Sequence, residues 1–449
     1  MVRLCETITT DHLAEWVVDA RRRTLDLIGD LSNNQLLGTS LQIVNPLLWE
    51  IGHMAWFYER WILRHADGRR PIRPDGDTLY DSMAVAHDTR WDLPLPTRDE
   101  TLRYMSQVQD HVLELLDESQ PRDELAYFVM LSVFHEDMHT EAFTYTRQTL
   151  GYGPPSWSGA AAAEEQLAGL DEAIGQAGSP PGDAEIPGGT FMLGASTKEP
   201  FVLDNEKWRH AVQVQPFVMA RTAVTQGEFL AFVEDAGYTR GEFWSSAGAD
   251  WREASGAAHP VYWRRTPAGQ WQRRDFDRWT ALEPNRPMLH TNWHEAEAYC
   301  RWAGRRLPTE AEWEVAALAE PTPGGDALSE RKRRFPWGDE RSTPRHANLD
   351  WRRMGTQDVA ALPDGDSPWG CRQMIGNVWE WTADTFGPYP GFVADPYEAY
   401  SRPWFGTRKV LRGGCWATRE RILRGTWRNY YKPDRRDVWA GFRTCEPRE

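Results

Sequence analysis

The chain has 449 residues, and 24 of them are tryptophan. Hydrophobic residues make up 41% of the sequence, and its formal net charge is −15. This apolar content excludes a mostly disordered protein, and the length suits two domains or one large one. The acidic balance argues against nucleic-acid binding, which needs a basic face. No run of about 18 uncharged apolar residues occurs, and acidic residues precede any apolar stretch at the N-terminus. We therefore expect no membrane span, no secretory signal and a cytoplasmic location.

The first third of the chain has the hydrophobic pattern of a helical bundle. Apolar residues recur there at helical spacing, with few strand-like alternations. Four such blocks in succession predict an antiparallel four-helix bundle in a domain that spans residues 1–152. The blocks cover residues 11–31, 46–65, 97–118 and 123–150.

The composition changes after this bundle. Residues 153–184 are rich in Pro, Gly and Ala, which predicts a linker with one short helix inside it. In residues 185–449, short apolar runs are broken by Gly, Pro, Asn and Asp, and eighteen of the tryptophans lie there. Two helical stretches, 225–237 and 292–304, interrupt long loops. The expected fold class is therefore α+β, in two domains.

The fourth helical block contains two histidines at metal-binding spacing. His135 and His139 stand four residues apart in FHEDMHTE, so both imidazoles lie on one face of the helix. That spacing allows both rings to bind one metal ion. Two solvated surface histidines would produce the same pattern, so the pair alone leaves both interpretations open.

The same segment matches HExxH, the zinc-protease signature in which Glu136 would be the general base. The extended form of that signature needs Gly and His where this chain has Ala142 and Tyr145. The Pro- and Gly-rich segment also begins soon afterwards, which leaves little room for a ligand on a following helix. The sequence therefore disfavours a protease.

A third imidazole is present in the second helical block. His53 lies in NPLLWEIGHMAWFYERWIL, where a lone histidine is usually a core residue. Facing helices of a four-helix bundle, however, often build a metal site from inward-pointing side chains. Three neutral imidazoles would leave coordination positions open on the ion, which suits catalysis by Zn or Fe.

Motifs along nearly the whole chain resemble a known two-domain family. GHMAWFYE and HEDMHTE resemble the DinB-like bundle of the sulfoxide synthases of ergothioneine and ovothiol biosynthesis. Later motifs resemble the formylglycine-generating-enzyme domain, a variant of the C-type lectin fold. The resemblance implies a DinB-like four-helix bundle followed by a formylglycine-generating-enzyme-like domain. The later motifs are IPGGTFMLG, NWHEAEAYCRWAG, RRLPTEAEWE, FPWGD, GNVWEWT, VLRGGCWAT and GFRTC.

The cysteines distinguish this chain from the formylglycine-generating enzyme itself. That enzyme resembles this sequence in its GGSW-type motif but has a reactive Cys pair shortly after it, whereas here the motif is GGCWAT and the next cysteine is near the C-terminus. We therefore do not expect sulfatase maturation. The cysteines lie far apart with no CxxC pair, which predicts buried free thiols. They are Cys5, Cys300, Cys371, Cys415 and Cys445.

The resemblance implies a metal and a reaction. His53, His135 and His139 would hold a mononuclear Fe(II), with O2 as co-substrate. Members of the family join a sulfur donor to the imidazole of hercynine, the trimethylated betaine of histidine. Three open positions on the ion could take the imidazole, the chalcogen and O2 together. The chain would then be a non-heme iron oxidoreductase that acts on small molecules and forms a C–S or C–Se bond.

The C-terminal segment RNYYKPDRRDVWAGFR resembles the RNW-type substrate loop of the family. By that resemblance Asn429 would hold the carboxylate region of hercynine. Tyr430 would lie near the trimethylammonium group, which needs aromatic faces because it cannot form hydrogen bonds. The alternative is that these aromatic residues belong to the ordinary core of a tryptophan-rich domain.

The family also uses a tyrosine beside the iron, which gives a proton so that C–S bond formation outruns simple thiol oxidation. The segment PYEAYS offers Tyr397 and Tyr400 for this role, and we expect Tyr397 to fill it. Tyr389 in PYPGF is a nearby substitute.

Two departures from the family pattern bear on the donor. Family members that use γ-glutamylcysteine have an RxxR pair, which binds its carboxylates. They also have an Asp after the RNW motif, which pairs with its amine. Here Arg90 is the only arginine between Tyr80 and Pro96, where we expect it to contact the substrate, and Tyr431 stands at the Asp position. The loss of these charge-assisted contacts predicts poor binding of an acidic dipeptide.

A third departure is Met138, which replaces a Gln of the ergothioneine enzymes and cannot make an amide hydrogen bond to a substrate. Together with the segments VAHDTRW and LPLP, these departures make the sequence resemble one branch of the family. Members of that branch join a selenosugar to hercynine in selenoneine biosynthesis. Trp91, Tyr431 and either Asp81 or Asp88 would bind the neutral sugar. Cysteine or γ-glutamylcysteine is the alternative donor. A lectin-like binding module with a structural metal in the bundle is an alternative of another class.

Overall fold

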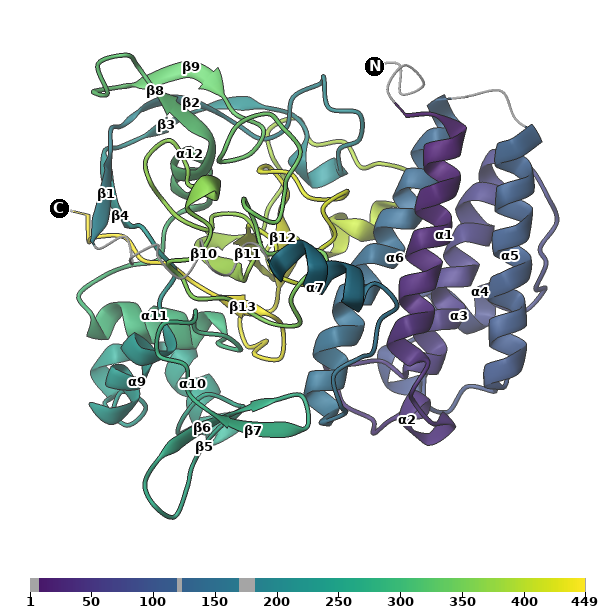
Figure 1. Cartoon of the computed structure of the whole chain (residues 1–449), viewed down its shortest axis with the longest axis horizontal. Coiled ribbons are helices and arrows are strands. Elements are labelled where there is room, and N and C mark those ends of the chain that lie inside the picture. Colours follow the sequence, from purple (N-terminus) through teal and green to yellow (C-terminus); the bar gives the residue numbers. More distant parts are fainter. Residues whose placement is uncertain (1–7, 119–122, 169–181, 449) are drawn as a thin grey trace. The chain divides into compact units, whose positions relative to one another are not determined.

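The chain forms two compact units in the computed structural model, which describes residues 8–118, 123–168 and 182–448 (Figure 1). Part of the expected linker, residues 169–181, lies outside the described residues, and helix α7 occupies Ala160–Ala168 within the remainder. Across the described ranges no helix combines the length and the apolar character needed to cross a membrane. The first unit comprises Met1–Gly159 with Thr197–Phe201, and the second comprises Ala160–Ser196 with Val202–Glu449.

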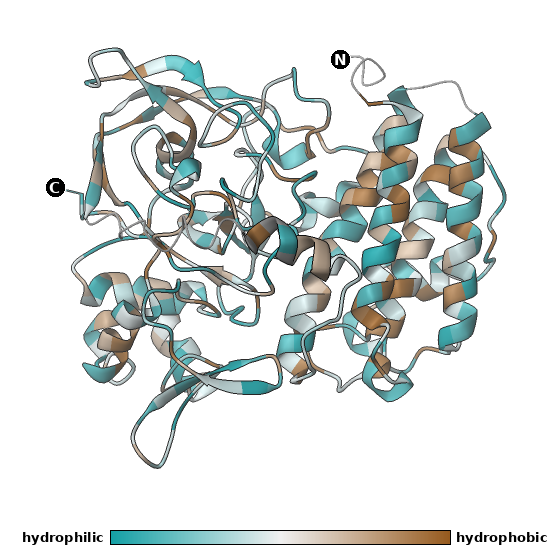
Figure 2. Cartoon of the chain, in the orientation of Figure 1, coloured by the Kyte–Doolittle hydropathy of each residue, from teal (hydrophilic) through white to brown (hydrophobic). Residues whose placement is uncertain are grey.

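The first unit is a helical bundle. Helix α1 packs against α5 and α6, and α3 packs against the same two helices. Figure 2 shows hydrophilic and hydrophobic residues alternating along α1 and α5, the pattern of helices with one face in a core. The helices are α1 (Thr10–Ile28), α2 (Asn33–Leu37), α3 (Leu47–Tyr58), α4 (Gly76–Tyr80), α5 (Arg98–Glu118) and α6 (Asp123–Leu150).

The helix predicted over residues 46–65 changes character partway. It is α-helical as α3 only to Tyr58 and continues as a π-helix, η2, over Glu59–Ala66. The Glu59 carboxylate accepts hydrogen bonds from the Tyr104 hydroxyl (2.6 Å) and the Ile72 backbone N–H (3.2 Å). A hydrophobic pattern predicts the helix but does not distinguish a π-helical turn from an α-helical one.

Besides α7, the described part of the second unit combines short strands with four helices of nine or ten residues. Its four-stranded sheet has the order β12-β11-β10-β13, antiparallel except for the β10–β13 pair. The helices are α9 (Gln226–Glu234), α10 (Ser246–Ser255), α11 (Trp293–Trp302) and α12 (Glu310–Leu318). The strands of the sheet are β10 (Trp379–Thr385), β11 (Lys409–Arg412), β12 (Asn429–Tyr431) and β13 (Ala440–Gly441).

Shorter strand pairs surround this sheet. Strand β1 pairs with β4, β2 with β3 and β8 with β9, and a three-stranded sheet has the order β5-β6-β7. Their bounds are β1 (Asp183–Ile186), β2 (Gly189–Leu193), β3 (His210–Val214), β4 (Phe217–Ala220), β5 (Trp263–Arg265), β6 (Trp271–Asp275), β7 (Arg278–Ala281), β8 (Ala319–Pro321) and β9 (Leu328–Lys332).

The second unit has more regular structure than the expected long loops. Helices α10 and α12 and the β5–β7 sheet were not predicted. For α12 the sequence carries a readable signal, since Thr309 and Glu312 in PTEAEWE form a capping box at its start. Several tryptophans of this unit are completely buried and pack in its core. These are Trp313, Trp351, Trp379, Trp381 and Trp416.

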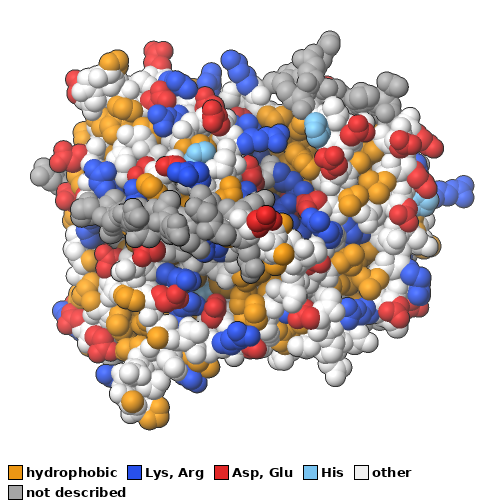
Figure 3. Space-filling view, viewed as in Figure 1, with side chains coloured by type: hydrophobic (Ala, Val, Ile, Leu, Met, Phe, Trp, Pro, Cys, Tyr) orange, Lys and Arg blue, Asp and Glu red, His pale blue; other side chains and the backbone are white. Residues whose placement is uncertain are grey.

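The surface mixes both signs of charge. Figure 3 shows Asp and Glu side chains interspersed with Lys and Arg on the face in view.

Candidate metal centre

Two buried histidines and one half-buried histidine of the first unit converge. His53 lies on α3, and His135 and His139 lie one turn apart on α6. The Nε2 atoms of His53 and His135 are 3.3 Å apart, and each of the three rings offers one nitrogen within 4.8 Å of the other two. The structure therefore brings together the three histidines that the sequence singled out.

This cluster fits a metal ion. Two nitrogens bound to one ion can be at most about 4.2 Å apart, twice a metal–nitrogen bond of about 2.1 Å. The 3.3 Å between His53 and His135 satisfies this limit as it stands, and the 4.8 Å bound on the whole set requires only a small rotation of a ring. Three imidazoles suit Zn, Fe or another transition metal rather than Mg or Ca, which prefer oxygen ligands.

Two of the rings are oriented by partners behind them. His53 Nδ1 lies 2.7 Å from the backbone oxygen of Tyr80, and His139 Nδ1 lies 3.3 Å from Glu50 Oε2. When Nδ1 donates to such an oxygen, the lone pair of Nε2 faces the opposite way and can bind an ion. The His135 ring stacks on Phe57, with centroids 3.7 Å apart and planes 5° apart.

Burial keeps two of these imidazoles neutral. Desolvation lowers the pKa of His53 and of His135 well below the ordinary value, and the neighbouring His139 lowers both further. The neutral imidazole is the form that binds a metal ion.

Gly52, next to His53, allows this arrangement. A Cβ atom at this position would lie 2.3 Å from Cε1 of Tyr80, far inside the contact distance. The absence of a side chain lets Tyr80 pack directly on α3, and the backbone oxygen of the same tyrosine then orients His53.

Glu136 does not have the position of a protease base. Its Oε1 accepts hydrogen bonds from Arg21 Nε (3.0 Å) and Thr24 Oγ1 (2.7 Å), both on α1, and its side chain is fully buried. These bonds hold the carboxylate against α1 in the bundle core. The geometry thus agrees with the sequence in disfavouring a protease.

The donor-binding residues expected in the first unit have different environments. Met138 is half-buried on α6, and Asp81 Oδ1 accepts a hydrogen bond from the Met83 backbone N–H. Trp91 is half-buried, and its Nε1 donates to the Leu37 oxygen. Arg90, by contrast, is only 7% exposed, and its guanidinium lies 3.9 Å from the ring of Trp49. Its burial favours a role inside the bundle over contact with a substrate.

The expected hercynine residues of the second unit lie on strand β12. Asn429 Oδ1 accepts from the Tyr430 backbone N–H (2.8 Å). The Tyr430 ring stacks on Phe386 with centroids 4.0 Å apart, and its hydroxyl donates to the Tyr400 backbone oxygen. The guanidinium of Arg435 lies over the ring of Tyr431. All three residues are half-buried rather than fully enclosed.

The three candidate tyrosines are placed differently within the second unit. The rings of Tyr397 and Tyr400 are neighbours, with centroids 6.4 Å apart. The Tyr400 hydroxyl accepts from Trp427 Nε1, and burial raises the pKa of Tyr400 above its ordinary value. The Tyr389 hydroxyl instead donates to Glu310 Oε1 at 3.2 Å, which places this tyrosine in a buried ionic cluster.

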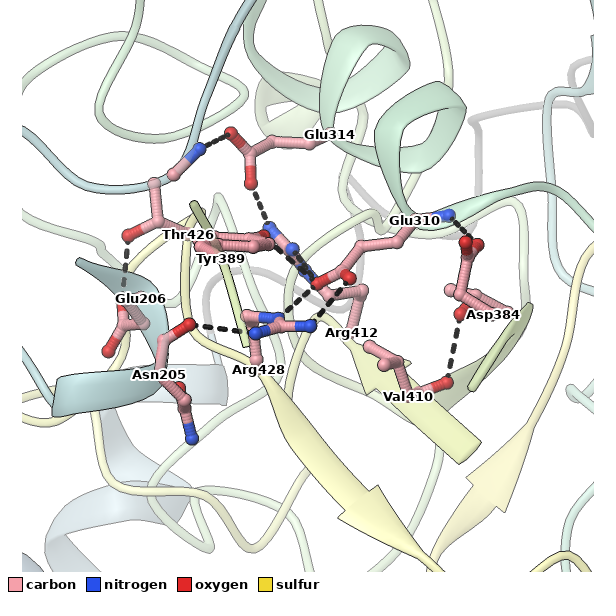
Figure 4. A network of polar contacts seen from close by, with 12 residues as sticks. Asn205, Glu206, Glu310, Glu314, Asp384, Tyr389, Val410, Arg412, Thr426 and Arg428 are labelled. Carbon is pink, nitrogen blue, oxygen red and sulfur yellow. Dashed lines mark hydrogen bonds and ion pairs between the residues drawn. The ribbon is translucent and has the colours of Figure 1, made fainter. Parts of the chain in front are cut away.

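Sequence reasoning missed that ionic cluster, which Figure 4 shows between α12 and strand β11. Arg428 makes a two-pronged contact with Glu310 (2.6 and 3.0 Å), and Arg412 bonds to Glu310 and Glu314. Burial raises the pKa of Glu310, but Arg428 and Arg412 outweigh it, so the pKa lies below the ordinary value. The available signal was Glu310 and Glu314, four residues apart on a helix whose only other charged residue is the capping Glu312.

The cysteine prediction is confirmed for the described residues. Cys300, Cys371, Cys415 and Cys445 are buried free thiols, and Cys5 lies outside the described residues. Burial raises the pKa of the Cys371 thiol, as expected for an inert buried cysteine.

Comparison with known proteins defines the class. Residues 17–143 match the DinB superfamily, and residues 172–447 match the sulfatase-modifying factor enzyme 1-like domain. The predicted α+β fold, a DinB-like bundle followed by a formylglycine-generating-enzyme-like domain, is thereby confirmed.

Full-length relatives narrow the class to one family. The chain is 37% identical to a hercynine oxygenase of Mycolicibacterium thermoresistibile, covering 96% of this chain and 94% of the relative. It is 36% identical to a hercynine oxygenase of Mycobacterium tuberculosis, covering 96% and 98%. A formylglycine-generating enzyme of Streptomyces coelicolor is 33% identical over 58% of this chain and 88% of its own length. The chain belongs to the hercynine oxygenase family and is an oxidoreductase.

Proposed function

We propose that this chain is a mononuclear non-heme iron enzyme that uses O2 to join a selenosugar to the imidazole of hercynine. Family membership and the three-histidine cluster support the iron, the O2 and the hercynine. The observation that carries the choice of donor is the burial of Arg90, the only arginine between Tyr80 and Pro96. Because its guanidinium is held inside the bundle, that segment supplies no cation for the carboxylates of an acidic dipeptide.

The proposed reaction balances. A selenol R–SeH and the C–H of the hercynine imidazole lose two hydrogens as a C–Se bond forms, and the selenium gains one oxygen. O2 accepts four electrons, two for the C–Se bond and two for the selenoxide, and its second oxygen leaves as water. The products are a hercynyl selenoxide and one water molecule.

His53, His135 and His139 would hold the iron, which when bound supplies a redox-active centre for O2 with coordination positions open to substrates. Glu50 and the Tyr80 carbonyl keep two of the imidazoles turned toward the ion. These groups belong to the bundle, whose helices hold them in place before any substrate binds.

The second unit would bind hercynine. The Asn429 oxygen is used by its neighbour's backbone N–H, so its NH2 group is the part that can donate to the substrate carboxylate. Tyr430 would offer a ring face to the trimethylammonium group. Tyr397 is assigned as the proton donor, with its neighbour Tyr400 as the second candidate.

The donor would be recognised without paired charges. Trp91 and Tyr431 offer aromatic surface, Asp81 offers a hydrogen-bond acceptor, and Met138 adds a polarisable contact. An acidic dipeptide would find neither the arginine pair nor an aspartate at position 431, and each lost charge-assisted bond costs about 1.5–3 kcal/mol.

A competition assay tests the donor. Purified protein with Fe(II), hercynine and O2 is offered a selenosugar with a free selenol, cysteine or γ-glutamylcysteine, and kcat/KM is measured for each. We expect the selenosugar to exceed γ-glutamylcysteine at least tenfold, about 1.4 kcal/mol. Fastest turnover with γ-glutamylcysteine or cysteine would overturn the proposed donor and identify a hercynine sulfoxide synthase instead.

A substitution at position 431 sharpens this assay. Tyr431→Asp introduces the negative charge that pairs with a donor amine, so it should raise kcat/KM for γ-glutamylcysteine relative to the selenosugar. Tyr431→Phe is the matched control, because it keeps the ring without adding charge and should leave the ratio of the two donors close to that of the wild type.

A further inference from the structure

Two of the three candidate metal ligands share one supporting side chain, that of Arg90. This residue follows a short 3-10 turn, His87–Thr89, in the segment between α4 and α5. Its Nη2 donates to the backbone oxygens of Val85 (3.2 Å) and Ser82 (3.3 Å), which fixes the guanidinium against its own loop. From this point two separate lines of contact lead to the histidines.

The first line is a chain of hydrogen bonds to His139. Arg90 Nη1 donates to Asn45 Oδ1 at 2.6 Å, and Asn45 Nδ2 donates to Glu50 Oε1 at 2.7 Å. The other carboxylate oxygen, Oε2 of Glu50, lies 3.3 Å from His139 Nδ1. Each polar group along the line thus has its next partner in place.

The second line is a stack of flat groups ending at His53. The guanidinium of Arg90 lies 3.9 Å from the ring of Trp49, and the Trp49 ring stacks on the His53 imidazole with centroids 4.8 Å apart and planes 10° apart. Trp49 Nε1 donates to the Leu79 oxygen at 2.7 Å, which prevents the indole from rotating. The stack holds the plane of the His53 ring while the Tyr80 oxygen holds its Nδ1.

Charge explains why Asn45 lies between Arg90 and Glu50. Glu50 is only 3% exposed, so its carboxylate needs a nearby cation, and Arg90 supplies one. A direct two-pronged bond to arginine would occupy both carboxylate oxygens. With Asn45 as intermediary, one oxygen faces the amide and the other remains on His139.

We propose that Arg90 is a positioning residue for the metal centre, acting on His139 through Asn45 and Glu50 and on His53 through Trp49. This rests on the metal-binding part of the proposed function and deepens it. The arginine that a thiol-dipeptide enzyme would present to its donor is used here to hold the candidate metal ligands, which leaves the donor-binding segment without an arginine for the donor.

The test measures metal affinity without turnover. Apo-protein is titrated anaerobically with Fe(II), and with Co(II) as a visible-absorption probe, against a competing chelator. The variants are Glu50→Gln, which keeps the volume of the side chain, Asn45→Leu, Arg90→Met and Arg90→Lys. We expect each to weaken binding of both metals by about 10–100-fold. Arg90→Lys should not restore affinity, because an ammonium cannot stack on Trp49 and bond to Asn45 in the same geometry.

A double variant and a control separate positioning from general loss of stability. If the line acts as a unit, Arg90→Met combined with Glu50→Gln should weaken binding by clearly less than the product of the two single effects. Arg98→Met is the control, because Arg98 also donates to two backbone oxygens of the bundle, those of Leu31 and Ile28. It should lower thermal stability and leave metal affinity within about twofold of the wild type.

The outcomes distinguish the two proposals. The positioning role is overturned if metal affinity is unchanged in Arg90→Met and Glu50→Gln while Arg90→Met raises the KM for the donor. Arg90 would then be a substrate-binding residue, and the proposal of an iron enzyme would stand. A wild-type protein that binds neither metal at one equivalent overturns both. Weakened affinity with an unchanged KM for the donor supports the positioning role, whichever donor proves correct.

Discussion

Each unit of the molecule buries a polar cluster, and the two clusters have opposite designs. In the second unit, glutamates of α12 pair with Arg412 of β11 and with Arg428, which directly precedes β12, so opposite charges meet within the cluster. In the first unit, each of three imidazoles offers a ring nitrogen near one point, burial lowers the pKa of His53 and His135, and Glu50 contacts Nδ1 of His139. A cluster whose charged groups pair with one another stabilises a fold. Ring nitrogens that converge on a common point are instead arranged to bind a ligand.

The largest effect is expected when one of the three converging imidazoles is removed. His53→Ala should abolish stoichiometric iron binding and reduce turnover to background, because two imidazoles on one helix face cannot hold the ion alone. Iron content by elemental analysis and folding by circular dichroism check this. His111→Ala on α5, where the histidine is exposed and contacts Glu114, is the matched control and should keep its iron.

The same measurement tests the lectin-like alternative. Iron in the wild type and its loss in the His53 variant support an iron enzyme. Stoichiometric zinc that survives anaerobic reconstitution with Fe(II) would instead indicate a structural metal and contradict the proposed chemistry.

The next largest effect is expected when a glutamate is removed from the buried ionic cluster of the second unit. Glu310→Gln removes the charge that Arg412 and Arg428 share, leaving two buried guanidiniums without their full counterion. Such a change should lower the free energy of unfolding by about 3–5 kcal/mol, measured by denaturant titration. Iron content of the folded fraction should not change, because the proposed ligands all lie on α3 and α6.

A control for this experiment is an exposed pair of the same unit. Arg345 and Asp364 bond at 2.7 Å with side chains 58% and 45% exposed, so Asp364→Asn should cost about 0–1 kcal/mol. If the two substitutions prove equally mild, the buried cluster does not stabilise the second unit as inferred.

A smaller effect should follow from adding one methyl group beside the histidines. Gly52→Ala puts a Cβ atom against the Tyr80 ring and should destabilise the protein by about 1–3 kcal/mol. Because displacement of Tyr80 also moves the oxygen that holds His53, metal affinity should fall several-fold in the same titration. Gly241→Ala, where a Cβ atom would meet nothing within 4 Å, should change neither quantity.

Sequence reasoning identified the three histidines that cluster in the bundle, but not the groups that orient their rings. The four-residue spacing placed His135 and His139 on one face, and the apolar bundle pattern made His53 a plausible third ligand. Glu50 was a readable signal, since it is a lone acid three residues before His53 on an apolar helix. The Tyr80 oxygen was not readable, because a backbone acceptor 27 residues away leaves no trace in a local pattern.

Arg90 is a second residue whose surroundings could not be predicted from the local sequence. Arg90 is the only arginine between Tyr80 and Pro96, and a charged side chain in a loop suggested a contact with the substrate. Its burial depends on Asn45 and Trp49, which lie more than 40 residues earlier in the chain. Local sequence therefore indicated that the position matters and left its role open.

The sequence by itself determined the bundle, the tryptophan-rich second domain and the three histidines, because helical periodicity and residue type are local properties of the chain. The tertiary structure alone decided which polar groups are paired. It turned Glu136 toward Arg21, placed Tyr389 on Glu310, and linked Arg90 through intermediate residues to two of the candidate metal ligands. Such pairings join residues distant in sequence, and burial makes their geometry decisive, since a buried polar group without a partner costs several times what a hydrogen bond contributes.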